Sequence, residues 1–221
     1  MPVPKKKNSF VRENARDRIL HQLYQWLIDG TLKPEERIYD EELSEYFNVS
    51  RTPVREALQV LSQKHLVEVL PSKCTRVAPI TIEETQQTFP LYADLHCLAL
   101  KFAFPHVDDK FIKHLEELNH KLMKAFSSQS SQAIQSADRD FHWAIIDLAN
   151  NKYLSGMIEE LEIHIYRAEN YFFAYKERSL QSVSDHQKII RALSEKNLQE
   201  ATELMYQNWL LNYQGLLESI K

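Results

Sequence analysis

Three side chains in the second half of the chain have the types and spacing of metal ligands. Asp138 and His142 are four positions apart, which places both on one face of a single helix. A carboxylate oxygen and an imidazole nitrogen both bind divalent metals. His186 begins a later helical stretch, beside the apolar residues Ile189 and Ile190. A lone histidine on an apolar face is more often an ordinary core residue, so this spacing leaves a metal site and a structural role both open.

A second group of polar side chains gathers near residue 50 and indicates contacts with nucleic acid. Arg51 and Arg55 have the chemistry to bond guanine edges in the major groove, and the hydroxyls of Ser50 and Thr52 suit phosphates. On an arbitrary helix, such arginines are more often merely solvated charges. The pattern of the surrounding elements distinguishes the two interpretations.

The spacing of apolar residues predicts the helices that carry this second group. One helix is expected to end near Gly30, and a short one to span about 40–47. After a break at Asn48 and Val49, Ser50 is a candidate N-cap, because its hydroxyl can accept an unpaired backbone N–H. The apolar face of the following helix is predicted to consist of Val54, Ala57, Leu58 and Leu61. Two short helices with such a turn make a helix-turn-helix, whose second helix enters the major groove.

A hairpin is predicted directly after these helices. Strands over 66–70 and 75–78 flank a turn that contains Lys73. A hairpin in this position is a wing, and Lys73 and Arg76 are expected to reach phosphate or the minor groove. Residues 1–78 are therefore predicted to form a winged helix-turn-helix DNA-binding domain.

The rest of the chain has helical periodicity throughout and almost no glycine. A linker is expected over 79–84 and a helical domain over 85–221. The helices are predicted at about 82–105, 108–127, 130–150, 153–177, 179–195 and 197–220. Short links between them indicate an antiparallel bundle, a fold that builds ligand sites from facing helices. The predicted fold class is therefore mainly α, with a winged helix-turn-helix followed by an all-helical antiparallel bundle.

Charge is distributed unevenly between these two regions. Residues 1–78 contain 13 Lys and Arg against 11 Asp and Glu, a net charge of +2, whereas the remainder contains 14 against 20, a net of −6. This asymmetry favours two domains with different partners. The three glycines do not cluster, which excludes the phosphate-binding loops of Walker and dinucleotide-binding proteins.

The two cysteines and the apolar segments predict a cytoplasmic protein without a membrane partner. Cys74 and Cys97 have no zinc-finger or CxxC spacing. No apolar run approaches the roughly 18 residues that span a bilayer, and the first residues lack the apolar segment of a secretory signal.

Two sets of motifs resemble known families. The run Val49–Leu58, VSRTPVREAL, resembles the DNA-binding domain of the GntR family. The segments 138–142, 149–154 and 185–189 resemble the FCD ligand-binding domain, found in the FadR subgroup of that family. The resemblance covers almost the whole chain. It implies a homodimeric bacterial transcription regulator, repressor or activator, that binds double-stranded operator DNA and a small-molecule effector. By the same resemblance, the matching DNA-contacting positions are Ser50, Arg51, Thr52 and Arg55, with Arg51 expected to contact the DNA backbone and Arg55 the bases.

The resemblance also bears on the metal site. Many FCD domains bind zinc or nickel through one aspartate and three histidines, and the metal in turn holds a carboxylate effector. Asp138, His142 and His186 match three of these positions, and Asn208 stands at the fourth. An amide oxygen is a weaker ligand than imidazole for such metals, so Asn208 or water is expected to complete the site.

The first helix of this domain also departs from the family pattern. Leu95 and Ala99 stand where an arginine and a glutamate are usual. His96 lies one residue further on and is expected to face a different direction from the pocket. Because the arginine helps to neutralise an acidic effector in the family, its absence leaves the chemistry of the effector open.

Three functions remain in contention at this point. The leading one is a regulator controlled by a metabolite carboxylate that a divalent metal holds. The second is a regulator with a metal-free pocket, such as a sensor of acyl-CoA. The third is a metal-dependent hydrolase, which would leave the helix-turn-helix unexplained and lacks an evident general base. The chain is therefore predicted not to be an enzyme.

Overall fold

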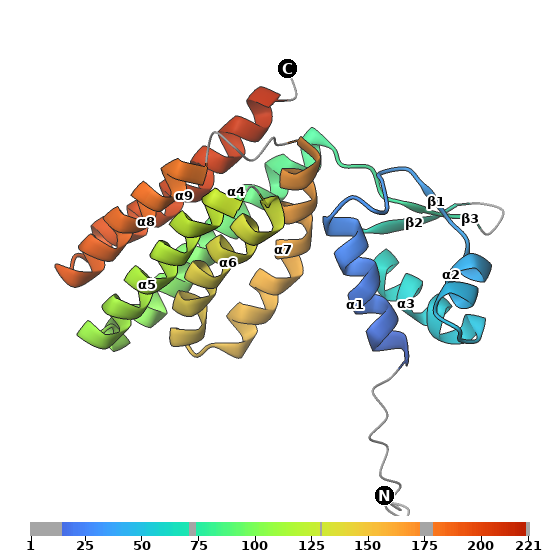
Figure 1. Cartoon of the computed structure of the whole chain (residues 1–221), viewed down its shortest axis with the longest axis horizontal. Coiled ribbons are helices and arrows are strands. Elements are labelled where there is room, and N and C mark those ends of the chain that lie inside the picture. Colours follow the sequence, from blue (N-terminus) through green and yellow to red (C-terminus); the bar gives the residue numbers. More distant parts are fainter. Residues whose placement is uncertain (1–14, 71–73, 129, 173–178, 220–221) are drawn as a thin grey trace, which may run out of the picture. The chain divides into compact units, whose positions relative to one another are not determined.

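The chain forms two compact units in the computed structural model, residues 1–79 and 80–221 (Figure 1). The structure describes residues 15–70, 74–128, 130–172 and 179–219. The predicted Lys73 therefore lies outside the described residues. Each unit is considered by itself.

Three helices make up most of the first unit, close to the predicted positions: α1 (Ala15–Ile28), α2 (Asp40–Tyr46) and α3 (Arg51–Gln63). Asn48 adopts a positive φ of 51°, a conformation that asparagine tolerates better than most residues. The N–H of Val49 donates to the carbonyl of Ser44 at 3.0 Å and closes the turn between α2 and α3. Ser50 is the N-cap of α3, but its hydroxyl makes no capping bond, so that part of the prediction is wrong.

The core of this unit lies between α1, α3 and a small sheet. Apolar faces of the two helices meet there and are buried, with contributions from Ile19, Leu23, Leu27, Val54, Ala57, Leu58 and Leu61. Beside this core, the Trp26 ring stacks on that of Phe47 at a centroid distance of 5.6 Å. The helix-turn-helix is therefore held rigidly by packing on α1.

The sheet has three antiparallel strands in the order β1-β3-β2. Strands β2 (Val67–Leu70) and β3 (Cys74–Val77) form the predicted hairpin, and Glu68 lies opposite Arg76 in their register. Strand β1 (Arg37–Ile38) was not predicted, because two residues carry no periodic pattern. It pairs with β3 and joins the hairpin to the chain that precedes α2.

The described part of the second unit contains six α-helices near their predicted positions: α4 (Ile82–Ala103), α5 (Asp109–Ala125), α6 (Ser131–Leu148), α7 (Lys152–Phe172), α8 (Ser179–Ser194) and α9 (Leu198–Ser219). Short 3-10 turns follow α4 and α5 at Phe104–His106 and Phe126–Ser128. The N-cap side chains of Thr81, Asp108 and Ser130 each accept a backbone N–H, which starts α4, α5 and α6 at these residues.

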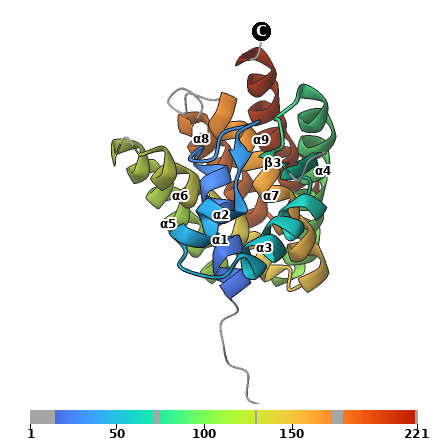
Figure 2. The same cartoon turned by 90° about the vertical axis from the view of Figure 1, so that its right-hand side faces the viewer.

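Helix α4 is the central element of this bundle. It packs against α6, α7 and α9, while α5 packs against α6 and α8 (Figure 1, Figure 2). Its buried residues recur every three or four positions, and they include Phe89, Tyr92, His96, Ala99 and Ala103. No described helix combines the length and apolar composition needed to cross a membrane.

Candidate metal centre and nucleic-acid interface

The structure brings Asp138, His142 and His186 together in the core of the second unit. Helix α6 presents Asp138 and His142, and α8 presents His186. The two histidine Nε2 atoms are 3.3 Å apart, and Asp138 oxygens lie 3.8 Å from the Nε2 of His142 and 3.6 Å from that of His186. Tetrahedral zinc with ligand bonds of about 2.1 Å separates its ligand atoms by roughly 3.4 Å. With one ligand atom taken from each residue, all three atoms lie within 4.8 Å of one another, so they could hold one metal ion.

Burial sets the protonation of these three groups. It lowers the pKa of His142 to about 3 and that of His186 well below its usual value. Both rings are therefore neutral near pH 7, with a lone pair on one nitrogen for a metal. Burial also raises the pKa of the Asp138 carboxyl to about 7. This carboxyl holds a proton below that pH, and a metal must displace the proton.

Asn208 of α9 lies beside this triad. Its side chain is buried, and its proximity to His142 partly offsets the lowering of the histidine pKa by burial. The Oδ1 atom of Asn208 is buried and has no hydrogen-bond partner among the described residues. The residue at the fourth position of the resemblance thus lies at the same centre as the three candidate ligands.

His96 also belongs to this centre, which corrects the expectation that it faces elsewhere. Its ring is 2% exposed and perpendicular to that of His142 at a centroid distance of 5.1 Å. The ring of Trp209, a residue that no sequence pattern singled out, lies at a centroid distance of 4.8 Å from the rings of both His96 and His142. His96 occupies the same helical face as Phe89 and Tyr92, and this spacing was the signal that could have placed it.

The cluster contains an unusual number of unpaired polar atoms. Six buried side-chain nitrogen or oxygen atoms of the described residues have no hydrogen-bond partner, and one of them belongs to Asn119 of α5. The other five surround this centre: His96 Nε2, His142 Nδ1, His186 Nδ1, Asn208 Oδ1 and Trp209 Nε1. Folded proteins leave very few buried polar atoms unpaired. The concentration of five at one place is expected of a pocket whose polar groups bind a ligand.

A buried carboxylate fixes the orientation of the helix that carries two of the ligands. Glu162 of α7 accepts hydrogen bonds from Arg139 at 3.0 Å and from Trp143 Nε1 at 2.6 Å. Both donors lie on α6, next to Asp138 and His142. The carboxylate therefore locks the rotation of α6 about its axis, which determines where the two ligands point.

The residues predicted to contact DNA are placed together at the start of α3. Ser50, Arg51, Thr52 and Arg55 are all exposed there. Each arginine has an acidic partner in α2. The Nε of Arg55 donates to Asp40 at 2.6 Å, and a terminal nitrogen of Arg51 donates to Glu41.

The wing arginine has acidic partners as well. Arg76 on β3 donates to Glu68 on β2 at 2.7 Å, and its guanidinium lies 3.7 Å from Glu35. Its side chain is 32% exposed. To reach DNA, Arg76 would have to leave these carboxylates or share them.

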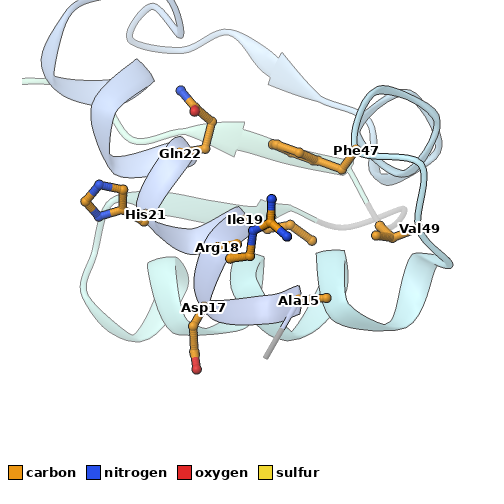
Figure 3. Close-up of a pocket in the computed structure, with 8 residues that line it drawn as sticks. All are labelled: Ala15, Asp17, Arg18, Ile19, His21, Gln22, Phe47 and Val49. Atoms are coloured by element: carbon orange, nitrogen blue, oxygen red, sulfur yellow. The ribbon is translucent and has the colours of Figure 1, made fainter. Parts of the chain in front are cut away.

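A hollow of about 690 Å³ lies beside the helix-turn-helix (Figure 3). Ile19 of α1 and two residues of the turn region, Phe47 and Val49, form apolar walls, and Arg18 and His21 add basic groups. Among the described residues that line the hollow, none is predicted to contact DNA or a metal.

Comparison with known families covers most of the chain. The family described as bacterial regulatory proteins, gntR family, matches residues 15–77, and the FCD domain matches residues 87–209. The FCD match alone spans more than half of the chain and contains every residue of the triad and Asn208.

Individual relatives agree with this assignment. The HTH-type transcriptional regulator McbR of Escherichia coli is 27% identical over 191 residues, which cover 84% of this chain and 86% of McbR. The Uxu operon regulator of Haemophilus influenzae is 30% identical over 197 residues, which cover 81% of this chain and 71% of that protein. These relatives are transcriptional regulators and not enzymes.

A solved structure confirms the fold. The structure of Escherichia coli McbR/YncC has a TM-score of 0.82 and 22% sequence identity, and the match covers 95% of this chain and 100% of that one. The predicted mainly α architecture, with a winged helix-turn-helix and a helical bundle, is therefore confirmed. The chain is a DNA-binding transcriptional regulator of the GntR family, with an FCD domain typical of the FadR-like subgroup.

Proposed function

We propose that this regulator is a homodimer that binds a specific operator and responds to a small carboxylate held by a divalent metal in the FCD domain. The observation that carries the proposal is the convergence of one ligand atom each from Asp138, His142 and His186 to within 4.8 Å of one another. Because its target is chromosomal DNA, we infer that it acts in the cytoplasm.

The donor set suits zinc or nickel. It combines one carboxylate with two neutral imidazoles, and both metals accept such ligands. A divalent metal beside one carboxylate keeps a net positive charge and an open position, which attracts an anionic oxygen. Asn208, His96 and Trp209 carry unpaired polar atoms around the same centre and are available to contact the rest of the effector.

Two other functions follow from the same cluster. A metal-free pocket would use these polar atoms directly, and it becomes the better explanation if no metal binds. A hydrolase has no supporting observation beyond the triad itself, and the relatives are regulators.

We infer that effector binding acts through the population of dimer arrangements. A helix-turn-helix dimer reads two half-sites only when its recognition helices have the spacing of successive major grooves. An effector shifts that equilibrium if it binds one arrangement more tightly than the other. Either sign of regulation, repression or activation, is compatible with this scheme.

An apolar stripe on α4 supports dimerisation through the FCD domain. Leu91, Leu98 and Phe102 are 50%, 39% and 44% exposed, and with the half-buried Leu95 they follow one face of the helix. Contiguous exposed apolar surface of this kind is typical of protein interfaces. We propose that a second copy of the chain covers it.

Replacing Leu98 and Phe102 with glutamate is expected to produce a monomer. Burying two unpaired charges per protomer would weaken the association by at least about 100-fold. Light scattering should then give a mass near 26.1 kDa instead of twice that value. Met123→Glu on α5, where the side chain is 45% exposed, is the control and should remain dimeric. A double variant with the wild-type mass would contradict this interface.

Metal affinity is expected to decrease as the pH falls below 7. The Asp138 carboxyl has a pKa of about 7, so it must lose its proton before it binds a metal, whereas the neutral histidines release none. Zinc binding should therefore release roughly 0.9 proton at pH 6 and roughly 0.1 at pH 8, and the affinity should fall about tenfold per unit below pH 7. Titration calorimetry in buffers of different ionisation enthalpy measures both quantities. Proton release that is equal at the two pH values would contradict the assignment of Asp138.

The proposed function is tested with an operator selected from random duplexes by the wild-type protein. Carboxylates of two to six carbons are added to zinc-loaded and to metal-stripped protein, and melting temperature and operator affinity are measured. At least one carboxylate should stabilise the loaded protein selectively and change its affinity for the operator. Equal effects on the stripped protein would instead favour the metal-free pocket.

A further inference from the structure

The two arginines at the start of α3 are held by acidic residues in different ways. Asp40 accepts from Nε of Arg55, the inner nitrogen of the guanidinium, at 2.6 Å. Glu41 accepts from a terminal nitrogen of Arg51. Asp40 and Glu41 occupy the first turn of α2, which packs against α3.

A contribution to the stability of the fold does not explain these two ion pairs. The Arg55 side chain is 65% exposed, and those of Arg51 and Glu41 are 45% and 65% exposed. Exposed ion pairs contribute little to the free energy of unfolding. Acidic residues also stabilise a helix when they lie in its first turn, but this stabilisation does not depend on either arginine.

The hydrogen bond that Asp40 accepts from Arg55 is compatible with recognition of a base by Arg55. An end-on bidentate contact with guanine O6 and N7 uses the two terminal nitrogens of an arginine, and Asp40 binds the third. An arginine anchored through Nε loses less conformational freedom when it meets a base. The hydrogen bond from Arg55 also lowers the pKa of Asp40, so the carboxylate stays charged near neutral pH.

The hydrogen bond that Glu41 accepts from Arg51 instead competes with a DNA contact. It engages a terminal nitrogen, the part of Arg51 that a phosphate would contact. Glu41 also carries an exposed negative charge beside Arg51, which would repel a phosphate that approaches this arginine. A duplex of any sequence must displace this carboxylate before it gains the contact with Arg51.

We propose that Asp40 is a positioning residue that orients Arg55 for the bases and thereby raises specificity, whereas Glu41 competes with phosphate for Arg51 and lowers affinity for all duplexes alike. The inference rests on the proposed DNA contacts of Arg51 and Arg55. Together the two carboxylates would favour the operator over the large excess of other sequences. They are also two of the 11 acidic residues that reduce the net charge of residues 1–78 to +2.

The test compares three isosteric variants, Asp40→Asn, Glu41→Gln and Glu42→Gln. Each removes one negative charge from the first turn of α2, and Glu42→Gln is the control for that general effect. Fluorescence anisotropy gives the affinity of full-length protein for the selected operator and for a scrambled duplex of the same length, over a range of salt concentrations.

Asp40→Asn is expected to lower the ratio of operator to scrambled affinity about tenfold relative to Glu42→Gln. Asp40→Glu, which retains a carboxylate, should recover part of that ratio. Glu41→Gln should raise both affinities about threefold more than Glu42→Gln does and leave the ratio unchanged. Thermal unfolding of all variants should match wild type, which separates positioning from a structural role.

Two results would overturn the inference in different ways. If Asp40→Asn has the same ratio as Glu42→Gln while the wild type selects a clear operator, the positioning role of Asp40 is refuted and the proposed function stands. If the wild type selects no sequence, or if Arg55→Ala leaves the ratio unchanged, the proposed base contact fails and the role of Asp40 fails with it.

Discussion

His142→Ala is expected to reduce the metal content from about one ion per protomer to less than about one tenth. His142 is one of the two candidate imidazole ligands, and its Nε2 lies 3.3 Å from that of His186 and 3.8 Å from Asp138. Its removal leaves one carboxylate, one imidazole and the weaker amide oxygen of Asn208. Even changes to groups that only support a ligand cost 10- to 100-fold in affinity, so loss of a ligand should cost at least about 100-fold.

The measurement is mass spectrometry of protein purified without a histidine tag or chelator. His120→Ala is the matched control, because His120 is exposed on α5 and lies outside the cluster. It should retain the wild-type metal content. If the His142→Ala variant still holds one ion per protomer, the triad is not the metal site. A wild type that binds no zinc or nickel after incubation would show that Asn208 has disabled the site, and the metal-free pocket would replace it.

The double variant Arg51→Ala/Arg55→Ala is expected to bind the selected operator at least about 100-fold more weakly than wild type. Loss of a bidentate contact between Arg55 and guanine costs about 1–3 kcal/mol of discrimination. Loss of a phosphate contact at Arg51 weakens binding to every sequence. It also reduces the slope of log affinity against log salt concentration by about one. The two effects add, because one acts on bases and the other on the backbone.

Single variants separate these contributions. Arg55→Ala should lower the affinity for the operator more than that for a scrambled duplex, whereas Arg51→Ala should lower both alike. Arg16→Ala is the control, since Arg16 is an exposed arginine of the same unit that pairs with Asp17 on α1. Wild-type affinity of the double variant across a salt titration would refute the placement of the DNA-reading surface.

Local sequence determined the helices and their ends. Periodic apolar residues predicted α1, α3 and the helices of the bundle to within a few residues, because each apolar pattern depends only on residues of the same helix. The positive φ of Asn48 and the caps at Thr81 and Asp108 likewise depend on residues only a few positions away. Strand β1 was missed because two residues gain their strand conformation only from pairing with β3.

The candidate metal centre was predicted in part for the same reason. Asp138 and His142 are four residues apart on one helix, so their common face follows from helical geometry alone. Their position beside His186 was implied only by resemblance, since it depends on how α6 packs against its neighbours. Periodicity could have placed His96 on the buried face of α4, but its contact with His142 required the packing of two helices.

Only the tertiary structure showed what surrounds the predicted residues. It revealed Trp209 against the histidines and the five unpaired atoms of this cluster, which come from α4, α6, α8 and α9. It also revealed that Asp40 and Glu41 hold the arginines of α3, a contact set by the turn between α2 and α3. The sequence by itself therefore determined the elements, the family and the types of side chain that we propose act on DNA and metal. The partners of those side chains were decided by the packing of helices distant in sequence, because side-chain contacts depend on crossing angles and rotations that no single segment encodes.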